Sequence, residues 1–121
     1  IVNTAAMTQV DDCETNKEDC NILNVEVVKW LVEISKEINA HLVHLSTDFI
    51  FDGTAGPYDE EAEANPISFY GVSKVAAERM VLKSRYQLDS VGQVMGTNTT
   101  VTVLFLYMEC QKTLLMIWLT K

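Results

Sequence analysis

Positive charge is scarce in this chain of 121 residues. Lysine and arginine together number 9, against 17 aspartate and glutamate residues, which gives a formal net charge of -8 at pH 7. Nucleic acids and anionic membrane surfaces are bound by clustered basic residues. The composition therefore predicts neither of them as a partner, and any anionic ligand has to be bound by a few local groups.

Long apolar runs are also missing. The runs VTVLFLYM at residues 101–108 and LLMIWL at 114–119 are each far shorter than the roughly 20 residues that a helix needs to cross a bilayer. Two interpretations of these runs stay open. They are either strands joined by a turn, or part of a tail that is translated out of frame. The opening IVNTAAMTQV has no basic residue, so no secretory signal peptide is predicted and the cytoplasm is the expected location.

Cysteine is too sparse for a structural framework. The three cysteines, Cys13, Cys20 and Cys110, include no C-x-x-C pair, which predicts neither a disulfide framework nor a zinc site. Ordinary thiols are expected, and Cys13 and Cys20 can share one helix face. A group of carboxylates lies between residues 58 and 64 without a spaced histidine, so we interpret it as a solvated loop and predict no metal site. Its members are Asp59, Glu60, Glu61 and Glu63.

Helical periodicity marks residues 17–39, where apolar residues recur at a spacing near 3.6. This helix is expected to pack, with Trp30 in the core or at a helix–sheet contact. The apolar strand HLVHL follows at residues 41–45, and Ile1 and Val2 are interpreted as the end of an earlier strand. Strand, helix and strand in this order are typical of a parallel sheet with covered faces, which predicts the α/β class.

A second helix is predicted from Asn65 and Pro66 to about Lys83, because Asn suits an N-cap and Pro the first helical position. Gly71 inside it is less favourable than Ala by about 1 kcal/mol. We therefore expect a close contact at Gly71, made by a bound cofactor or by the neighbouring strand. The residues expected to face inward are Val72, Val75, Ala76, Met80 and Val81.

Tyr70 and Lys74 lie one helical turn apart and so share a face. An ammonium near a phenol lowers the phenol pKa from its ordinary value of about 10, which suits a general acid for a carbonyl oxygen. Thr47 follows the strand at the carboxyl edge of the sheet, where ligands bind, and its hydroxyl can donate to the same oxygen. His41 and His44 have no spaced partner and are assigned no role in the chemistry.

Residues 46–78, STDFIFDGTAGPYDEEAEANPISFYGVSKVAAE, resemble the dTDP-4-dehydrorhamnose reductase family of the extended short-chain dehydrogenase/reductases. The shared pattern is a strand ending in S-T-D, an aromatic-F-D-G turn, a Y-x-E loop, a proline and Y-G-x-[ST]-K. NTAAMTQVD at residues 3–11 is similar to the family's N-A-A-x-T-x-V-D segment, and the resemblance covers roughly residues 1–85. The chain departs from the family in lacking a G-x-x-G-x-x-G turn and, after Tyr86, in losing the pattern.

The resemblance implies a partial Rossmann-like, doubly wound parallel sheet, with residues 1–86 as the second half of an NAD(P)-binding domain and 87–121 as an atypical apolar tail. It implies reduction of the 4-keto group of a dTDP-6-deoxyhexose, a sugar nucleotide, by NADPH or NADH in dTDP-L-rhamnose biosynthesis. The implied catalytic residues are Thr47, Tyr70 and Lys74. The implied cofactor-binding residues are Asn3, Ala5, Ala6, Tyr70 and Lys74. The implied substrate-binding residues are Thr47, Asp48 and Tyr58.

Two alternatives stay open beside the reductase. The first is another sugar-nucleotide enzyme of the same superfamily, an epimerase or a dehydratase. The second is a non-catalytic binding module, because relatives of this reductase act as regulatory subunits of methionine adenosyltransferase. The expected protein partner is accordingly a second copy of the chain or a regulated enzyme.

Overall fold

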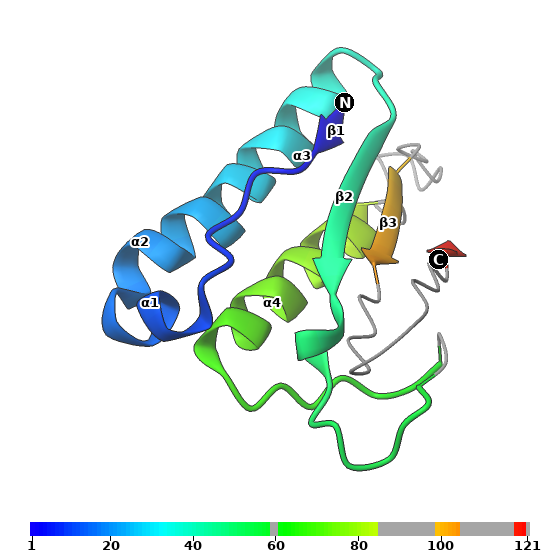
Figure 1. Ribbon diagram of the computed structural model, residues 1–121. Helices are drawn as coiled ribbons and strands as arrows, with labels where there is room; N and C mark the ends of the chain where they lie inside the picture. The colour runs from blue at the N-terminus through cyan, green and yellow to red at the C-terminus, as the bar shows by residue number, and fades with distance from the viewer. Residues whose placement is uncertain (59–60, 85–98, 105–117, 121) are drawn as a thin grey trace.

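The computed structural model describes residues 1–58 and 61–84, and the backbone alone of 99–104 and 118–120. Its elements follow the order expected of an α/β chain (Figure 1). They are β1 (Val2–Asn3), α1 (Val10–Thr15), α2 (Lys17–Asn21), the π-helix η1 (Ile22–Glu26), α3 (Val27–Glu37), β2 (Leu42–Thr47), the 3-10 helix η2 (Asp48–Ile50), α4 (Phe69–Ser84), β3 (Thr99–Leu104) and β4 (Trp118–Thr120).

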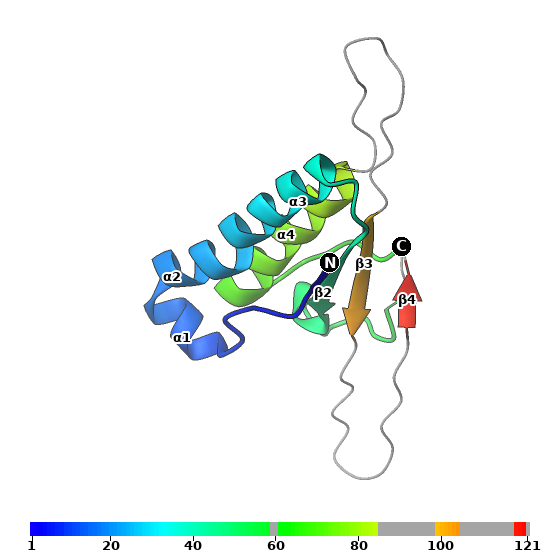
Figure 2. The same ribbon diagram turned by 90° about the horizontal axis from the view of Figure 1, so that it is seen from above.

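The sheet has the order β1-β2-β3-β4. β1 pairs parallel with β2 and β2 parallel with β3, with Val43 opposite both Val2 and Thr100, whereas β4 pairs antiparallel with β3. Figure 2 shows the described helices on one face of this sheet. Parallel neighbours need crossover connections, and here helices α1 to α3 and then α4 supply them. This arrangement confirms the α/β class.

The two C-terminal strands come from the segment that the sequence assigned to a separate tail. β3 continues the sheet from β2, and β4 continues it from β3. The interpretation of the apolar runs as strands therefore fits the part of each run that the structure describes. The boundary after residue 86 stays a prediction, and residues 85–98 lie outside the described part.

The main core lies between the sheet and the two long helices. Val28 and Val32 of α3 meet Ala77 and Val81 of α4 over Leu42 of β2, and all five side chains are buried. Full burial of a side chain the size of Val or Leu stabilises a fold by about 1.5–3 kcal/mol. This core fixes α4 against β2, which brings the residues of the candidate site together.

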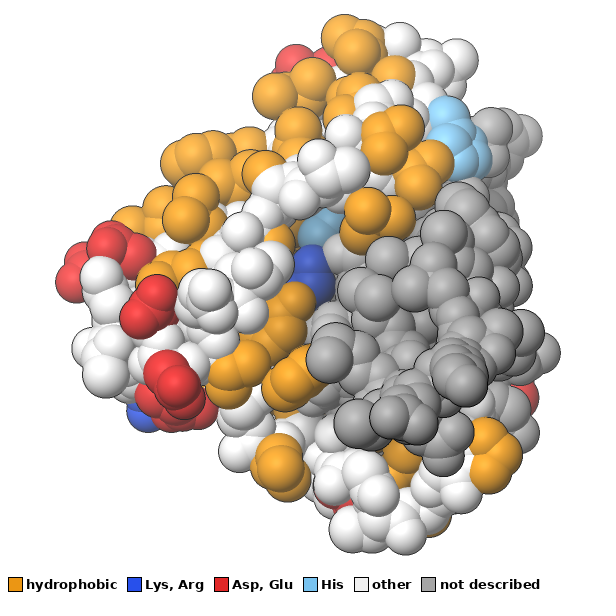
Figure 3. Space-filling view, in the orientation of Figure 1, with side chains coloured by type: hydrophobic (Ala, Val, Ile, Leu, Met, Phe, Trp, Pro, Cys, Tyr) orange, Lys and Arg blue, Asp and Glu red, His pale blue; other side chains and the backbone are white. Residues whose placement is uncertain are grey.

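The predicted helix over residues 17–39 is interrupted by a π-helical segment, and the prediction for Trp30 was wrong. Trp30 is 53% exposed and Ile38 is 63% exposed. Together with Ile34 they lie on the side of α3 that faces away from the core, because the apolar stripe of the sequence is wider than the face that contacts the sheet. Figure 3 shows hydrophobic side chains gathered over α3 and acidic ones over α1 and α2.

The second long helix begins at Phe69, three residues after the predicted start. Asn65 does not cap it, because its backbone N–H donates to Ile50 O and its side chain binds Asp52. Instead the Phe69 N–H donates to a Glu14 carboxylate oxygen at 2.5 Å. Val75 and Val81 are buried as expected and Ala76 and Met80 are partly buried, but the inward assignment of Val72 was wrong, because its side chain is 48% exposed.

Candidate active site

The predicted catalytic side chains come from β2 and α4, which pack against each other. Thr47 is the last residue of β2, and Tyr70 and Lys74 lie in the first half of α4. All three are at least nine-tenths buried. The fold therefore brings the three residues to the carboxyl end of β2, the edge at which open α/β sheets bind ligands.

Lys74 is a buried amine held by the backbone and by a histidine. Its Nζ donates to the carbonyl oxygen of Leu45 at 2.6 Å and lies 3.4 Å from His44 Nε2. Burial lowers the pKa of Lys74 to about 8, an effect that the nearby carboxylate of Glu78 opposes. A lysine with this pKa exchanges its proton far more readily near neutral pH than an exposed lysine does.

Tyr70 is buried among hydrophobic groups, close to Thr47. Its ring meets Phe49 edge-on with 5.7 Å between ring centroids, and it packs with the thiols of Cys13 and Cys20. Burial raises the pKa of the Tyr70 phenol above its ordinary value, and the hydrogen bond with Thr47 opposes that rise. The prediction that Lys74 holds this pKa low was wrong for this structure, because the Lys74 amine binds Leu45 O beside His44 instead.

Thr47 connects the tyrosine to the segment that follows β2. Its Oγ1 accepts a hydrogen bond from the Phe49 N–H at 3.3 Å and donates to Asp48 Oδ1 at 3.1 Å. Asp48, predicted to contact substrate, is thus placed next to the Thr47 and Tyr70 pair. A hydroxyl proton can be donated to one acceptor at a time, so Thr47 has to turn away from Asp48 to donate to another oxygen.

The segment predicted to line a cofactor cleft begins directly at the end of β1. Asn3 is buried, and its Oδ1 accepts from the Ala5 N–H at 3.1 Å while its Nδ2 lies 3.2 Å from His44 Nδ1. Ala5 is exposed and Ala6 is partly buried. The structure therefore brings Asn3 into contact with the Lys74 environment through His44 and leaves Ala5 at the surface.

Asn24 holds this segment in place and was missed from the sequence. Its side chain accepts from the Met7 N–H at 2.8 Å and donates to Met7 O at 3.0 Å, and its Nδ2 also lies 3.0 Å from Ser73 Oγ. Ser73 Oγ in turn donates to Tyr70 O. Asn24 lies in the π-helix η1, and π-helical turns inside α-helices are frequent at functional sites. A lone asparagine in a helical stretch gave no sequence signal for this role.

Tyr58 does not join the other predicted site residues. Its ring stacks on Phe51 with 4.2 Å between centroids, and its hydroxyl donates to Asp52 Oδ1 at 2.7 Å. Asp52 also accepts from Thr54 and Asn65, and these hydrogen bonds hold the pKa of its carboxyl well below the usual range. Tyr58 thus shapes the loop after β2 and packs in a different cluster from Tyr70.

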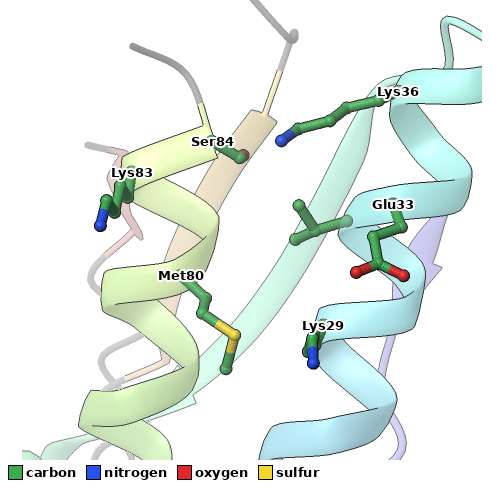
Figure 4. Close-up of a pocket in the computed structure, with 7 residues that line it drawn as sticks. Lys29, Glu33, Lys36, Met80, Lys83 and Ser84 are labelled. Carbon is green, nitrogen blue, oxygen red and sulfur yellow. The ribbon is translucent and has the colours of Figure 1, made fainter. Parts of the chain in front are cut away.

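A groove of about 210 Å³ lies between the outer faces of α3 and α4. Figure 4 shows the residues of α3 and α4 that line it. None of the predicted site residues lines this groove. Its lining residues are Lys29, Val32, Glu33, Lys36, Met80, Lys83 and Ser84.

Metal ligation and membrane spanning find no support in the described part of the chain. In residues 1–58 and 61–84, no three His, Cys, Asp or Glu side chains lie close enough together to hold a metal ion. Within the same stretches, no helix is both long enough and apolar enough to cross a membrane.

Comparison with known proteins places this geometry in a family. Residues 1–92 match the family model described as the RmlD substrate binding domain. The dTDP-4-dehydrorhamnose reductase of Aggregatibacter actinomycetemcomitans is 39% identical over 83 residues, which cover 68% of this chain and 28% of that protein. Methionine adenosyltransferase 2 subunit beta of Xenopus laevis is 34% identical over 84 residues, which cover 69% of this chain and 25% of that protein.

A solved structure supports the same assignment. The dTDP-4-dehydrorhamnose reductase of Bacillus anthracis str. Ames in complex with NADP superimposes with a TM-score of 0.74 at 27% identity, covering 88% of this chain and 34% of that one. This chain spans about a quarter of the length of the curated relatives that it matches. The matches confirm the resemblance and the Rossmann-like fold, and the chain belongs to the RmlD substrate-binding-domain family.

Proposed function

We propose that this chain carries the catalytic segment of an NAD(P)H-dependent reductase that converts the 4-keto group of a dTDP-6-deoxyhexose to an alcohol. The observation that carries the proposal is that the fold buries Thr47, Tyr70 and Lys74 together at the carboxyl end of β2. The relatives named as dTDP-4-dehydrorhamnose reductases support the choice of substrate. A place in dTDP-L-rhamnose biosynthesis and a cytoplasmic location belong to the same proposal.

The chemistry asked of the chain is one proton transfer to the substrate oxygen. The reduction adds a hydride to the keto carbon and a proton to its oxygen, which gives a secondary alcohol. Tyr70 has the proton to give at neutral pH, because a phenol has an ordinary pKa of about 10 and burial raises the pKa of Tyr70 further. Thr47 donates a hydrogen bond to the developing oxyanion or to the phenolate that Tyr70 becomes. Each of these hydrogen bonds requires Thr47 to release Asp48.

The residues present fit part of a nicotinamide cofactor. Ser46 Oγ is buried without a hydrogen-bond partner among the described residues, and the neighbouring Lys74 offers a weakly basic amine. A hydroxyl and an amine are groups that can bind the hydroxyls of a ribose. When bound, NADPH or NADH would supply the hydride. Lys74, Tyr70 and the segment from Asn3 to Ala6 are the groups that we propose to hold it.

We propose that Asp48 contacts the substrate, and its hydrogen bond with Thr47 supports this proposal. The Tyr58 hydroxyl is hydrogen-bonded to Asp52. We therefore propose that Tyr58 acts on the substrate indirectly, by shaping the loop that is proposed to cover the sugar nucleotide. No pyrophosphate-binding residues are proposed for this chain, since its sequence contains no G-x-x-G-x-x-G turn.

A second candidate function is regulatory binding to another enzyme. It is favoured by the 34% identity to methionine adenosyltransferase 2 subunit beta. A regulatory subunit would keep the same fold and cofactor-binding residues without turnover. Its partner would be a methionine adenosyltransferase catalytic subunit, whereas a reductase would have a second copy of itself as the expected partner.

One assay separates the two. The intact protein is mixed with NADPH and dTDP-4-dehydrorhamnose, NADPH absorbance is followed, and the sugar nucleotide is analysed by chromatography. Loss of NADPH matched by an equal amount of reduced sugar supports the reductase. Bound NADPH without turnover, together with binding to a purified methionine adenosyltransferase catalytic subunit, would overturn the reductase in favour of the regulatory module.

A further inference from the structure

Both ring nitrogens of His44 face nitrogen atoms of other side chains. Nδ1 lies 3.2 Å from Asn3 Nδ2, and Nε2 lies 3.4 Å from Lys74 Nζ. His44 is 1% exposed, so water does not replace either contact. A neutral imidazole has one nitrogen that donates and one that accepts. The two contacts therefore constrain each other.

The orientation of Asn3 sets one end of this chain of contacts. Its Oδ1 accepts from the Ala5 N–H, so its Nδ2 is the group that donates to His44 Nδ1. The proton of His44 then has to be on Nε2, pointing at Lys74. That contact is a hydrogen bond only if Lys74 is a neutral amine with a free electron pair, which accepts from Nε2 while donating to Leu45 O.

A protonated Lys74 requires the opposite arrangement. An ammonium only donates, so His44 Nε2 has to accept and the His44 proton moves to Nδ1. Nδ1–H then needs an acceptor, and the Asn3 amide supplies one by turning its Oδ1 toward the ring. This turn takes the acceptor away from the Ala5 N–H. Because His44 is buried, an Nδ1–H without an acceptor is unfavourable, and this favours a concerted change of the His44 proton and the Asn3 amide.

We propose that His44 is a positioning residue that couples the protonation state of Lys74 to the orientation of the Asn3 amide. The catalytic meaning of this coupling rests on the proposed function, because Lys74 and the segment starting at Asn3 are both proposed to hold the cofactor. When Lys74 is protonated, the Ala5 N–H is free to donate to a ligand oxygen. When Lys74 loses its proton, the Ala5 N–H returns to Asn3 Oδ1.

The electrostatics of the buried groups are consistent with this coupling. Burial and the charge of Lys74 lower the pKa of His44 to about 3, so the imidazole is neutral throughout the range in which Lys74 titrates near 8. Among the described residues, the charged groups that act on this pair are Glu78 on α4, which raises the pKa of Lys74, and Lys74 itself, which lowers that of His44. Asn3 on β1 contributes a dipole and no charge.

The direct test is the tautomer of His44 as a function of pH, read by two-bond 1H–15N NMR on the intact, 15N-histidine-labelled protein without cofactor or substrate. We expect the proton on Nδ1 below a midpoint near pH 8 and on Nε2 above it. Lys74→Met should leave it on Nε2 at every pH, and the matched control His41→Gln should leave the transition unchanged. One tautomer throughout the titration of the unaltered protein, or uptake of a second proton near pH 6.5, would overturn the coupling.

A kinetic measurement tests the catalytic meaning separately. The assay uses NADPH and dTDP-4-dehydrorhamnose. His44→Phe should move the midpoint of the pH profile of kcat by at least about 0.5 pH unit, because the protonation of Lys74 is linked to His44. KM for the sugar nucleotide should change less than about twofold. A merely structural role would lower kcat equally at every pH and would contradict the coupling. Absence of turnover in the unaltered protein would overturn the proposed function, whereas the tautomer titration would still decide the coupling.

Discussion

Gly71 of α4 lies directly against the backbone carbonyl oxygen of Phe49. A β-carbon at residue 71 would overlap this oxygen and would lie 2.8 Å from Pro66 Cβ. The close contact expected at Gly71 is therefore real, but the turn after β2 and Pro66 supply it in place of a cofactor or a strand. Because Gly71 has no side chain, the backbone of Phe49 can lie against α4. This contact also holds the nearby Thr47 and the Phe49 ring, which packs on Tyr70, close to α4.

Gly71→Ala is predicted to destabilise the protein by about 1–3 kcal/mol, because the added methyl group forces backbone atoms apart. The sign is informative, since Ala stabilises an ordinary helix position by about 1 kcal/mol relative to Gly. Urea unfolding measures the effect. Val72→Ala, at the neighbouring exposed position, is the matched control and should change stability by less than about 1 kcal/mol. A stabilised Gly71→Ala protein would contradict the contact.

Asn24→Ala is predicted to destabilise the protein by about 2–4 kcal/mol, because it removes the acceptor of the Met7 N–H and leaves the Met7 C=O with the weak Cys13 thiol as its donor. The Met7 amide should also exchange with solvent at least tenfold faster. Urea unfolding and amide hydrogen exchange measure the two effects. Asn21→Ala changes an exposed asparagine of the neighbouring turn and should have little effect. Equal stability losses in the two variants would argue against the clamp.

Stability should fall on acidification below pH 6.5 because of His44. Its folded pKa of about 3 lies below the ordinary value of 6.5, so between these values the unfolded chain binds a proton that the folded one does not. The free energy of unfolding should therefore fall by about 1 kcal/mol for each pH unit lost in this window. Urea titrations between pH 5 and 6.5 should show a smaller slope in His44→Phe than in the unaltered protein, and His41→Gln should keep the larger slope. An unchanged slope in His44→Phe would contradict the burial of a neutral imidazole.

The Cys13 thiol should react slowly. Burial and its contact with Cys20 raise the pKa of Cys13 to about 12, and the two sulfurs lie 2.7 Å apart. The reactive thiolate is therefore about a thousandfold scarcer than for an ordinary thiol. Iodoacetamide labelling followed by mass spectrometry should be at least about 100-fold slower at Cys13 in the native protein than in 8 M urea. Equal rates in the two conditions would show that the thiol is accessible.

The sequence predicted the local elements better than the contacts between them. The apolar strand before Ser46 and the Tyr70 and Lys74 spacing were visible, because strand composition and helical spacing are local properties. The start of α4 was not visible, since Glu14 caps it from another helix. The exposure of Trp30 was missed for a similar reason, because packing against the sheet decides which part of a wide apolar stripe is buried.

His44 shows the limit of sequence reasoning at the site. The sequence analysis assigned His44 no role because no partner is spaced with it, and its partners Asn3 and Lys74 lie 41 and 30 residues away in sequence. Only the pairing of β1 with β2 and the packing of α4 bring them together. The roles of Thr47, Tyr70 and Lys74 in the reaction stay predictions, which the structure supports by placing the three residues together.

The central claim is that Tyr70 gives its proton to the substrate oxygen. The most direct measurement is kcat of the Tyr70→Phe protein with NADPH and dTDP-4-dehydrorhamnose, alongside its affinity for NADPH from fluorescence titration. Because general acid catalysis contributes about 10²–10⁴-fold, we predict a loss of that size in kcat with NADPH affinity changed less than about threefold. Tyr86→Phe, at a tyrosine without an assigned role, should retain full activity. A Tyr70→Phe protein that turns over at the unaltered rate would contradict the account.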